Sequence, residues 1–301
     1  MATTLHTLAP GDEAALEAFL VQHADSSMFL RSNARGAGLA DEGKPYQATY
    51  VAALEQGRIV AVAAHCWNGL VIVQAPVHTE EVARAAVERS GRAKRIGVTG
   101  PYEQVERVRR ALGFAEHLAA RDGREKLFVL ELAALRVPAP LVAGEVVCRR
   151  SAPGDVERLA RWRAAYSTEL FGWAPGPALD ASSREHVARQ HEDGSAFVLV
   201  SGKEGEGERE GERGEPVSCT FFNARLPDMV QVGGVWTPPE LRGRGHARAV
   251  VAGSLLSARG EGATRAILFT GAENRAAIAA YEALGFTLAG EYGLFLLAGA
   301  G

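Results

Sequence analysis

The sequence predicts a mixed α/β fold divided into two domains, on the evidence of chain length, composition and an internal repeat. At 301 residues the chain is long for one domain and suits two domains of about 150 residues each. Its content of 47% hydrophobic and 23% charged residues is typical of globular proteins with a sizeable core. An internal repeat of two short segments divides the sequence into two similar halves.

Two short segments occur in the same order in each half of the sequence. The tetrapeptide Ala-Pro-Gly-Asp at 9–12 recurs at 152–155, each time before a helical apolar pattern. The tetrapeptide Ala-Leu-Gly-Phe at 111–114 recurs at 283–286, each time after a strand-like run and a helix. Such an ordered repeat indicates a duplicated domain. The alternative is two unrelated halves that share short Ala- and Gly-rich matches by chance.

Two irregular stretches interrupt these patterns. Between Arg136 and Gly144, Pro138 and Pro140 break both helical and strand patterns, which predicts a linker. The expected domains are therefore residues 1–137 and 145–301. The stretch 201–216 is rich in Gly, Glu, Arg and Lys and is expected to be a solvated loop between two strands.

Charge, hydropathy and cysteine usage narrow the function. The formal net charge of -3 gives no basic field, so neither nucleic acid nor an anionic membrane surface is an expected partner. The absence of an apolar run of about 18 residues or a signal-like start predicts a cytoplasmic protein without a membrane span. The three cysteines are far apart with no CxxC pair, so we expect no disulfide framework and no metal site.

The second half shows a clear order of elements. Asp155 is expected to cap a first helix, and Asn274 is expected to cap a late one that ends at Gly285. Strands are predicted over 196–200, 217–223, 229–237, 266–270, 286–288 and 292–297, and a further helix over 247–258. The order is helix, three strands, helix, strand, helix, strands.

The segment 241–248 lies between a predicted strand and a predicted helix and has the composition of an anion site. Gly243 and Gly245 allow positive φ and close approach of a ligand to the backbone. The free N–H groups of the first helical turn lie at the positive end of the helix dipole. Arg242, Arg244 and Arg248 add charged donors, so the segment suits a pyrophosphate.

Two common nucleotide loops do not fit this segment. A P-loop requires a Lys before Ser or Thr, and a dinucleotide fingerprint requires a third Gly where Arg248 stands. The pattern Arg242-x-x-Gly245-x-Ala247 instead resembles the acyl-CoA loop of the GNAT N-acyltransferases. Asn274, followed by Tyr281 and then Phe286, is similar to the second motif of that family, and the resemblance extends over about 145–297.

The resemblance implies a fold of two tandem GNAT-like domains, each a mixed, largely antiparallel central sheet flanked by helices. It also implies that acetyl-CoA, or another short acyl-CoA, inserts between splayed central strands and pairs with the backbone of Val235 and Thr237. The cofactor-binding residues that it implies are Val235, Trp236, Thr237, Arg242, Gly243, Arg244, Gly245, His246, Ala247 and Asn274.

Transfer of an acyl group to an amine needs an acid and a base. Tyr281 stands at the family position for the acid that protonates the leaving thiolate, and its alternative role is an interior ring. An alkylammonium has a pKa of about 10.4, so a base is expected as well. The base is left open between Asp228, Glu169 and an ordered water. The aromatic residues Trp162, Phe171 and Trp173 are candidates for either an acceptor pocket or the core.

The first half is expected to be a copy that has lost the chemistry. It has no glycine in 74–81, and Glu80 and Glu81 occupy the helix end that a phosphate would need. Alignment on Leu-Gly-Phe places Arg109 opposite Tyr281. We expect this half to act as a lid, as a wall of the acceptor pocket or as the surface of a homodimer.

The predicted reaction is transfer of an acetyl or other short acyl group to the primary amine of a small molecule or peptide. Alternatives are a non-catalytic acyl-CoA sensor and an enzyme of the glycine-conjugating type that uses larger acyl groups. The acceptor amine is not identified by the sequence.

Overall fold

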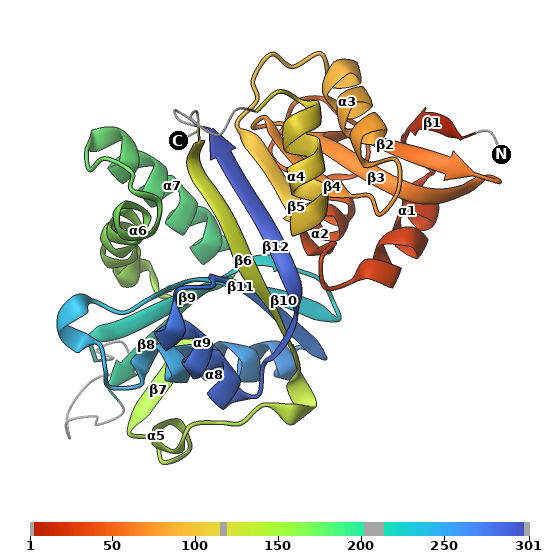
Figure 1. The fold of residues 1–301 in the computed structure, drawn as a ribbon. Helices are drawn as coiled ribbons and strands as arrows, with labels where there is room; N and C mark the ends of the chain where they lie inside the picture. The colour runs from red at the N-terminus through yellow and green to blue at the C-terminus, as the bar shows by residue number, and fades with distance from the viewer. Residues whose placement is uncertain (1–2, 115–118, 202–213, 298–301) are drawn as a thin grey trace. The chain divides into compact units, whose positions relative to one another are not determined.

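The computed structural model describes residues 3–114, 119–201 and 214–297. Most of the predicted loop at 201–216 lies outside the described residues. The chain forms two compact units: unit 1 runs to Leu127 and resumes at Ala289, and unit 2 comprises Phe128–Leu288. Figure 1 shows both units, and each is described here by itself.

Unit 1 contains the first set of elements. In chain order they are β1 (Thr4–Thr7), α1 (Glu13–Leu20), η1 (Val21–His23), α2 (Met28–Ala37), β2 (Ala48–Glu55), β3 (Arg58–Cys66), β4 (Leu70–Gln74), α3 (Thr79–Ser90), β5 (Gly97–Pro101), α4 (Tyr102–Ala111) and the first part of β6 (Ala119–Glu131).

Unit 2 repeats the same order. After the end of β6 come η3 (Leu132–Ala134), α5 (Ala139–Val142), β7 (Val146–Arg150), η4 (Pro153–Asp155), α6 (Val156–Phe171), α7 (Pro177–Glu192), β8 (Ala196–Ser201), β9 (Pro216–Arg225), β10 (Met229–Trp236), η5 (Pro239–Leu241), α8 (His246–Gly260), β11 (Arg265–Gly271), α9 (Arg275–Leu284) and the start of β12 (Thr287–Leu297). Each unit thus runs strand, two helices, three strands, helix, strand, helix. The expected tandem repeat is confirmed.

The first repeated tetrapeptide forms the same turn in both units. The Asp12 carboxylate accepts a hydrogen bond from the Ala9 N–H at 2.9 Å, and the Asp155 carboxylate accepts one from the Ala152 N–H at 2.7 Å. Asp155 is the N-cap residue of α6, as expected, but its side chain accepts no hydrogen bond from the N–H groups of that helix. Its oxygen closes the turn behind it, because an Asp side chain reaches its own loop backbone easily.

The second repeated tetrapeptide ends a helix in both units. Gly113 and Gly285 have φ of +70° and +101°, a conformation in which glycine is favoured as a helix C-cap. The Phe114 N–H then donates to Arg109 O, and the Phe286 N–H donates to Tyr281 O, at 2.9 and 3.1 Å. Arg109 and Tyr281 therefore occupy equivalent positions on α4 and α9.

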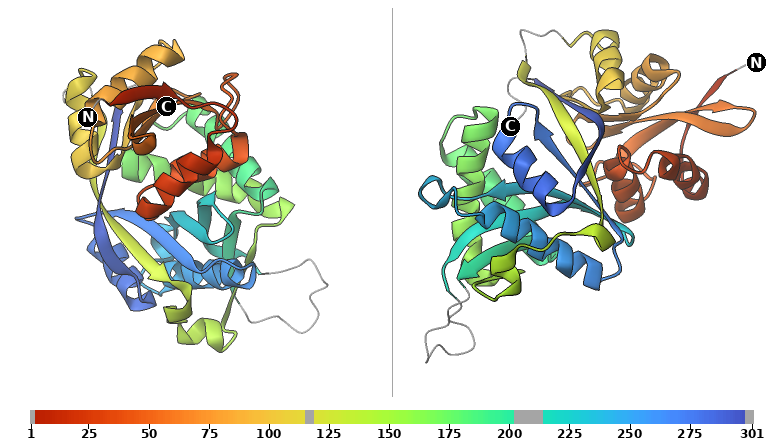
Figure 2. Two further views of the ribbon diagram at one scale, coloured as in Figure 1. Left: turned by 90° about the vertical axis from the view of Figure 1, so that its right-hand side faces the viewer. Right: turned by 60° about the horizontal axis from the view of Figure 1, so that its bottom comes forward.

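Alternation along β8 assigns its side chains to two cores. Ala196, Val198 and Val200 pack with α6 and α7, whereas Phe197 and Leu199 pack with α8 and α9. Successive side chains of a strand point to opposite faces. The two helix pairs therefore cover opposite faces of the unit 2 sheet, as Figure 2 also shows.

The strand order shows that each unit takes in a strand from the other half of the sequence. In unit 1 the order is β1-β2-β3-β4-β5-β12-β6, and β12 pairs antiparallel with β5 through Gly293 and Gly100. In unit 2 the order is β6-β11-β10-β9-β8-β7, and Phe128 and Leu130 of β6 are buried in its core. The predicted linker at 136–144 thus falls inside unit 2. The boundaries 1–137 and 145–301 remain a prediction.

Several elements differ from the sequence expectation. The strands expected at 286–288 and 292–297 are one strand, β12. Strand β7 and helix α7 were not predicted, since α7 has only Leu179 and Val187 as large buried apolar residues over its 16 positions. The linker contains the four-residue helix α5, because Pro140 is tolerated in a first helical turn.

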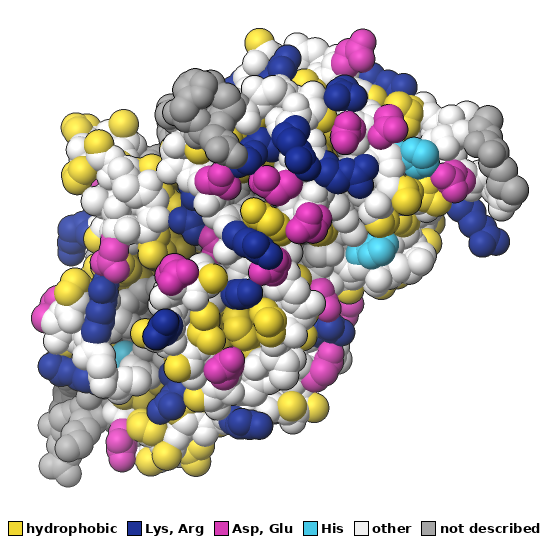
Figure 3. Space-filling model, viewed as in Figure 1, with side chains coloured by type: hydrophobic (Ala, Val, Ile, Leu, Met, Phe, Trp, Pro, Cys, Tyr) yellow, Lys and Arg dark blue, Asp and Glu magenta, His cyan; other side chains and the backbone are white. Residues whose placement is uncertain are grey.

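The helices, the surface charge and the cysteines of the described residues bear on the sequence expectations. Among the described residues, no helix combines the length and apolar character needed to cross a membrane. The face drawn in Figure 3 carries positive and negative side chains interspersed. Cys66 and Cys219 are buried, Cys148 is half-buried, and all three are free thiols.

The exchanged strands predict that the sequence halves do not fold separately. A fragment of 145–301 lacks Phe128, Leu130 and Leu132, which are buried in unit 2. Each such side chain contributes about 1.5 to 3 kcal/mol by burial, and the edge of β11 would lose its partner strand. We expect this fragment to show no cooperative thermal unfolding by circular dichroism.

Co-expression provides the control for this prediction. Fragment 1–137 carries β6, so the two fragments made together should assemble and unfold cooperatively. A stable, monomeric 145–301 fragment would contradict the assignment of the β6 end to the core of unit 2.

Candidate functional site

Strand β10 loses one of its two partners half-way along its length. It pairs in parallel with β11 from Met229, opposite Arg265, to Val232, opposite Leu268. Beyond Val232 it pairs, among the residues that the structure describes, with β9 alone, and the register of that pairing shifts between Gly233 and Trp236. Gly234 has φ of +57° within this bulge. The edge of β10 towards β11 is therefore open to another extended chain or ligand.

The open strand leads directly into the glycine-rich loop and α8. Gly243 and Gly245 both have φ of +78°, as expected from the sequence. The first hydrogen bond within α8 is the one that the Ala249 N–H donates to Gly245 O at 3.0 Å. The N–H groups of His246 and the next two residues precede this bond, so they have no partner within the helix. They lie at the positive end of the α8 dipole.

The arginines of the loop have different surroundings. The Arg242 guanidinium donates to Thr237 O at 3.0 Å, pairs with Glu169 at 2.9 Å and lies 4.8 Å from the Trp236 ring centre. Arg244 donates to the Glu240 carbonyl at 3.3 Å. Arg242 therefore stabilises the backbone just after β10, and Arg244 stabilises the loop through its bond to Glu240.

The Arg248 side chain lies against Gly245 of the glycine loop. Its Nη2 lies 3.7 Å from the point where a Cβ on Gly245 would be, and its buried Nε has no hydrogen-bond partner among the described residues. This guanidinium is available to an anion placed at the α8 N-terminus. Burial and the neighbouring Arg244 lower the pKa of His246, so His246 stays neutral and adds a donor without a charge.

Helix α9 places Asn274 and Tyr281. The Asn274 side chain accepts from the Ala277 N–H at 3.1 Å, which confirms the helix N-cap. Contact between Asn274 and a cofactor remains a prediction. Tyr281 is 8% exposed and packs edge-on against Phe286 with ring centres 6.0 Å apart.

The surroundings of Tyr281 keep its phenol protonated. Burial raises the pKa of Tyr281, and the nearby Tyr166 raises it further. The Tyr166 ring centre lies 6.3 Å from that of Trp236, at the open end of β10. Tyr281 is therefore a hydrogen-bond donor at neutral pH.

The structure narrows the choice of base. Asp228 precedes β10, and eight residues at about 3.3 Å each separate it from the loop end by roughly 25 Å. Asp228 therefore lies far from the glycine loop, whereas Glu169 lies at the loop through its pair with Arg242. The choice of base between Asp228, Glu169 and an ordered water stays a prediction.

Sequence reasoning missed one aromatic residue at this site, Tyr166 of α6. Trp162 packs on the core between α6, α7 and the sheet. Phe171 and Trp173 have ring centres 5.3 Å apart, and Tyr166 lies 5.7 Å from Phe171. Tyr166 thus connects these rings to Trp236. The i, i+4 spacing from Trp162 was the signal that could have indicated it.

Comparison with known proteins agrees with this geometry. Residues 158–286 match the acetyltransferase (GNAT) family. The matched residues lie within unit 2. The mycothiol acetyltransferase of Streptomyces coelicolor is 27% identical over 212 residues, which cover 69% of this chain and 63% of that protein. The matched segment is thus less than two thirds of that relative's length.

Solved GNAT structures share the fold. A GCN5-related N-acetyltransferase from Sphaerobacter thermophilus has a TM-score of 0.56 at 17% identity, covering 98% of this chain and 95% of its own. A tandem GNAT protein from the clavulanic acid biosynthesis pathway has a TM-score of 0.55 at 15% identity, and the match covers 100% of this chain and 99% of that protein. These similarities support two GNAT-like domains in one chain.

The GNAT-like unit 1 closes the strand edge that unit 2 leaves open. Strand β4 pairs with β5 up to Ile72, as β10 does with β11 up to Val232. The next residue of β4, Val73, still lies against β5. Its carbonyl oxygen is so close to Gly100 of β5 that a Cβ placed on Gly100 would lie only 2.4 Å from it. The end of this strand edge is therefore occupied by protein backbone.

Side chains satisfy the backbone that follows β4. The Ala75 N–H donates to Gln104 Oε1 at 2.6 Å, and Thr79 Oγ1 donates to Ala75 O at 2.7 Å. Arg109, at the place equivalent to Tyr281, pairs with Asp122 at 2.5 Å. Unit 1 thus offers neither an open backbone nor a phenol at these positions.

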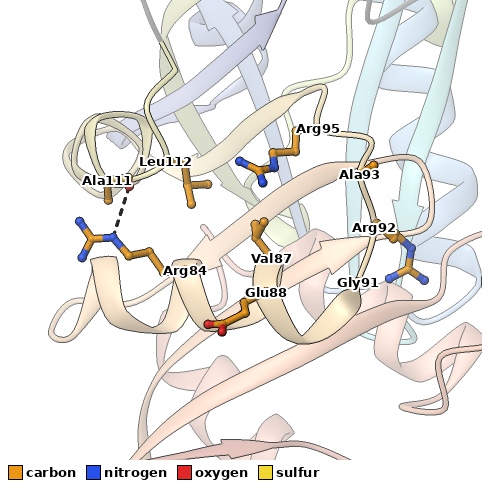
Figure 4. Close-up of a pocket in the computed structure, with 9 residues that line it drawn as sticks. All are labelled: Arg84, Val87, Glu88, Gly91, Arg92, Ala93, Arg95, Ala111 and Leu112. Carbon is orange, nitrogen blue, oxygen red and sulfur yellow. Dashed lines mark hydrogen bonds between the residues drawn. The ribbon is translucent and has the colours of Figure 1, made fainter.

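A pocket of about 500 Å³ in unit 1 is not an alternative phosphate site. Figure 4 shows its lining, which comprises Arg84, Val87, Glu88, Gly91, Arg92, Ala93, Arg95, Ala111 and Leu112. Arg92 pairs with Asp41, and Arg84 donates to the carbonyl of Ala111. The pocket lies at the C-terminal ends of α3 and α4, where the helix dipoles disfavour an anion.

These contrasts predict one acetyl-CoA per chain. Gly245→Glu places a Cβ at a positive φ and a carboxylate where an anion would bind, so calorimetric binding should be lost while the circular dichroism spectrum is kept. Gly245→Asn is the control, since Asn tolerates the left-handed region and adds no charge. A stoichiometry of two would mean that unit 1 also binds.

Proposed function

We propose that unit 2 transfers an acetyl group from acetyl-CoA to the primary amine of a small molecule or peptide. The observation that carries this proposal is the open edge of β10, which is followed, after η5 and the glycine loop, by the N–H groups at the α8 N-terminus that have no partner within the helix. An extended pantetheine and a pyrophosphate need these two features in this order. The family match over 158–286 supports the same reaction.

Each part of acetyl-CoA has residues that suit it. The backbone of Val235 and the N–H of Thr237 would pair with the pantetheine, since Arg242 already uses the Thr237 carbonyl. The pyrophosphate would lie on the N–H groups of the loop and first turn of α8. The residues that we propose for acetyl-CoA are Val235, Trp236, Thr237, Arg242, Gly243, Arg244, Gly245, His246, Ala247 and Asn274.

The reaction follows from this arrangement. The neutral amine attacks the thioester carbonyl, a C–N bond forms, the C–S bond breaks, and coenzyme A leaves. The proton that the amine nitrogen loses balances the one that the thiolate gains. Tyr281 donates a hydrogen bond to the sulfur as charge develops, because its pKa lies above the thiol value of about 8.5. Glu169, through a water, is our proposed route for the amine proton.

A panel of acceptors tests the proposal. Release of free thiol from acetyl-CoA should depend on an added amine, with amino acids, polyamines, aminoglycosides and peptide N-termini as candidates. The acceptor of the mycothiol acetyltransferase relative belongs in the panel. Binding of acetyl-CoA without amine-dependent thiol release from any acceptor would favour a sensor over an enzyme.

Replacement of the phenol tests the acid. Tyr281→Phe removes only the hydroxyl from a buried ring, so the fold should be retained. We expect kcat to fall by about 10²-fold or more, with acetyl-CoA affinity nearly unchanged. Tyr50→Phe, which removes the hydroxyl of a buried ring in unit 1, serves as a matched control. Wild-type turnover in Tyr281→Phe would exclude this residue from the chemistry.

A further inference from the structure

Helix α6 brings a guanidinium to the bulge of β10. The Arg163 Cζ lies 5.2 Å from the Tyr166 ring centre, one helical turn before that residue. Its Nη1 lies 3.6 Å from the point where a Cβ on Gly234 would be. Arg163 is thus close to the open segment of β10, on the sheet face covered by α6 and α7.

This guanidinium lacks an anionic partner within the described parts of the chain. Neither a hydrogen bond nor an ion pair reaches it there, and burial lowers its pKa. Both acidic residues of α6 are engaged with other arginines: Glu157 pairs with Arg184 at 3.0 Å, and Glu169 pairs with Arg242 at 2.9 Å. Arg163 is half-buried, so its guanidinium donors remain available to an anionic ligand.

A second polar group lies beside Arg163. His186 of α7 has a buried Nε2 with no hydrogen-bond partner among the described residues. Its ring centre is 6.1 Å from that of Phe221, and the Phe221 ring is also the nearest group to a Cβ placed on Gly234. Burial first and Arg163 second lower the pKa of His186 to about 3, so its imidazole is neutral. In the tautomer protonated at Nε2 it offers one N–H.

We infer that Arg163 and His186 bind a carboxylate of the acceptor, so that the substrate is an amine that also carries a carboxylate. This inference rests on the proposed acetyl transfer and names its acceptor class. A planar guanidinium and one neutral N–H match the two oxygens and single charge of a carboxylate. A phosphate group would bring up to two charges to a single cation. The carboxylate beside the bulge would leave the amine near Trp236 and Tyr281.

Matched acceptors test the inference in the unaltered protein. An amino acid, its α-amide and the alkylamine without the carboxyl group are compared by free-thiol release. We expect kcat/KM to favour the amino acid by roughly 10- to 100-fold over both neutral amines, the effect of a charge-assisted bidentate contact. Equal rates for the three acceptors would overturn the inference and leave the proposed function intact. If no amine is acetylated, both fail.

Variants assign the preference to the two side chains. Arg163→Gln should reduce the ratio of kcat/KM for the amino acid over its amide to near one, and His186→Gln should reduce it in part. Arg161→Gln, which removes the same charge from an exposed position of α6, should leave the ratio unchanged. Arg163→Lys keeps the charge without the planar fork and should give an intermediate ratio if Arg163→Gln fails to fold. A full preference in a folded Arg163→Gln or Arg163→Lys would overturn the assignment.

Discussion

Strand β10 pairs with β11 only as far as Val232, and beyond that residue its backbone lacks a partner on one side. Backbone N–H and C=O groups seldom remain unpaired away from water, so an open strand edge invites an extended ligand. The bulge at Gly234 turns the strand, Arg242 fastens its end to Thr237, and the loop then carries the chain into α8. The other features of the site are arranged around this edge.

Unit 1 shows the same fold with that edge closed. Gly100 brings β5 against the Val73 carbonyl, and Gln104 and Thr79 satisfy both backbone groups of Ala75. The two units therefore differ in the hydrogen-bond partners of the backbone at the end of β4 in unit 1 and of β10 in unit 2. The strand end in unit 1 is satisfied by protein groups, whereas β10 in unit 2 pairs with β11 only as far as Val232.

The exchanged strands give the duplication a structural role. Phe128 and Leu130 come from the first half of the sequence and fill the core of unit 2, while β12 from the second half pairs with β5 in unit 1. Because each core contains residues from both halves, the folding of one unit depends on the presence of the other half.

The sequence by itself determined the local features: the repeat, the positive φ of Gly243 and Gly245, the cap at Asn274 and the equivalence of Arg109 with Tyr281. Each of these depends on residues within a few positions of one another, where spacing fixes geometry. Tertiary structure decided which distant residues meet. It placed Asp228 at the start of β10, brought Tyr166 and Arg163 to the bulge, and divided β6 and β12 between unit 1 and unit 2. These outcomes depend on strand order and helix packing, which residue spacing does not encode.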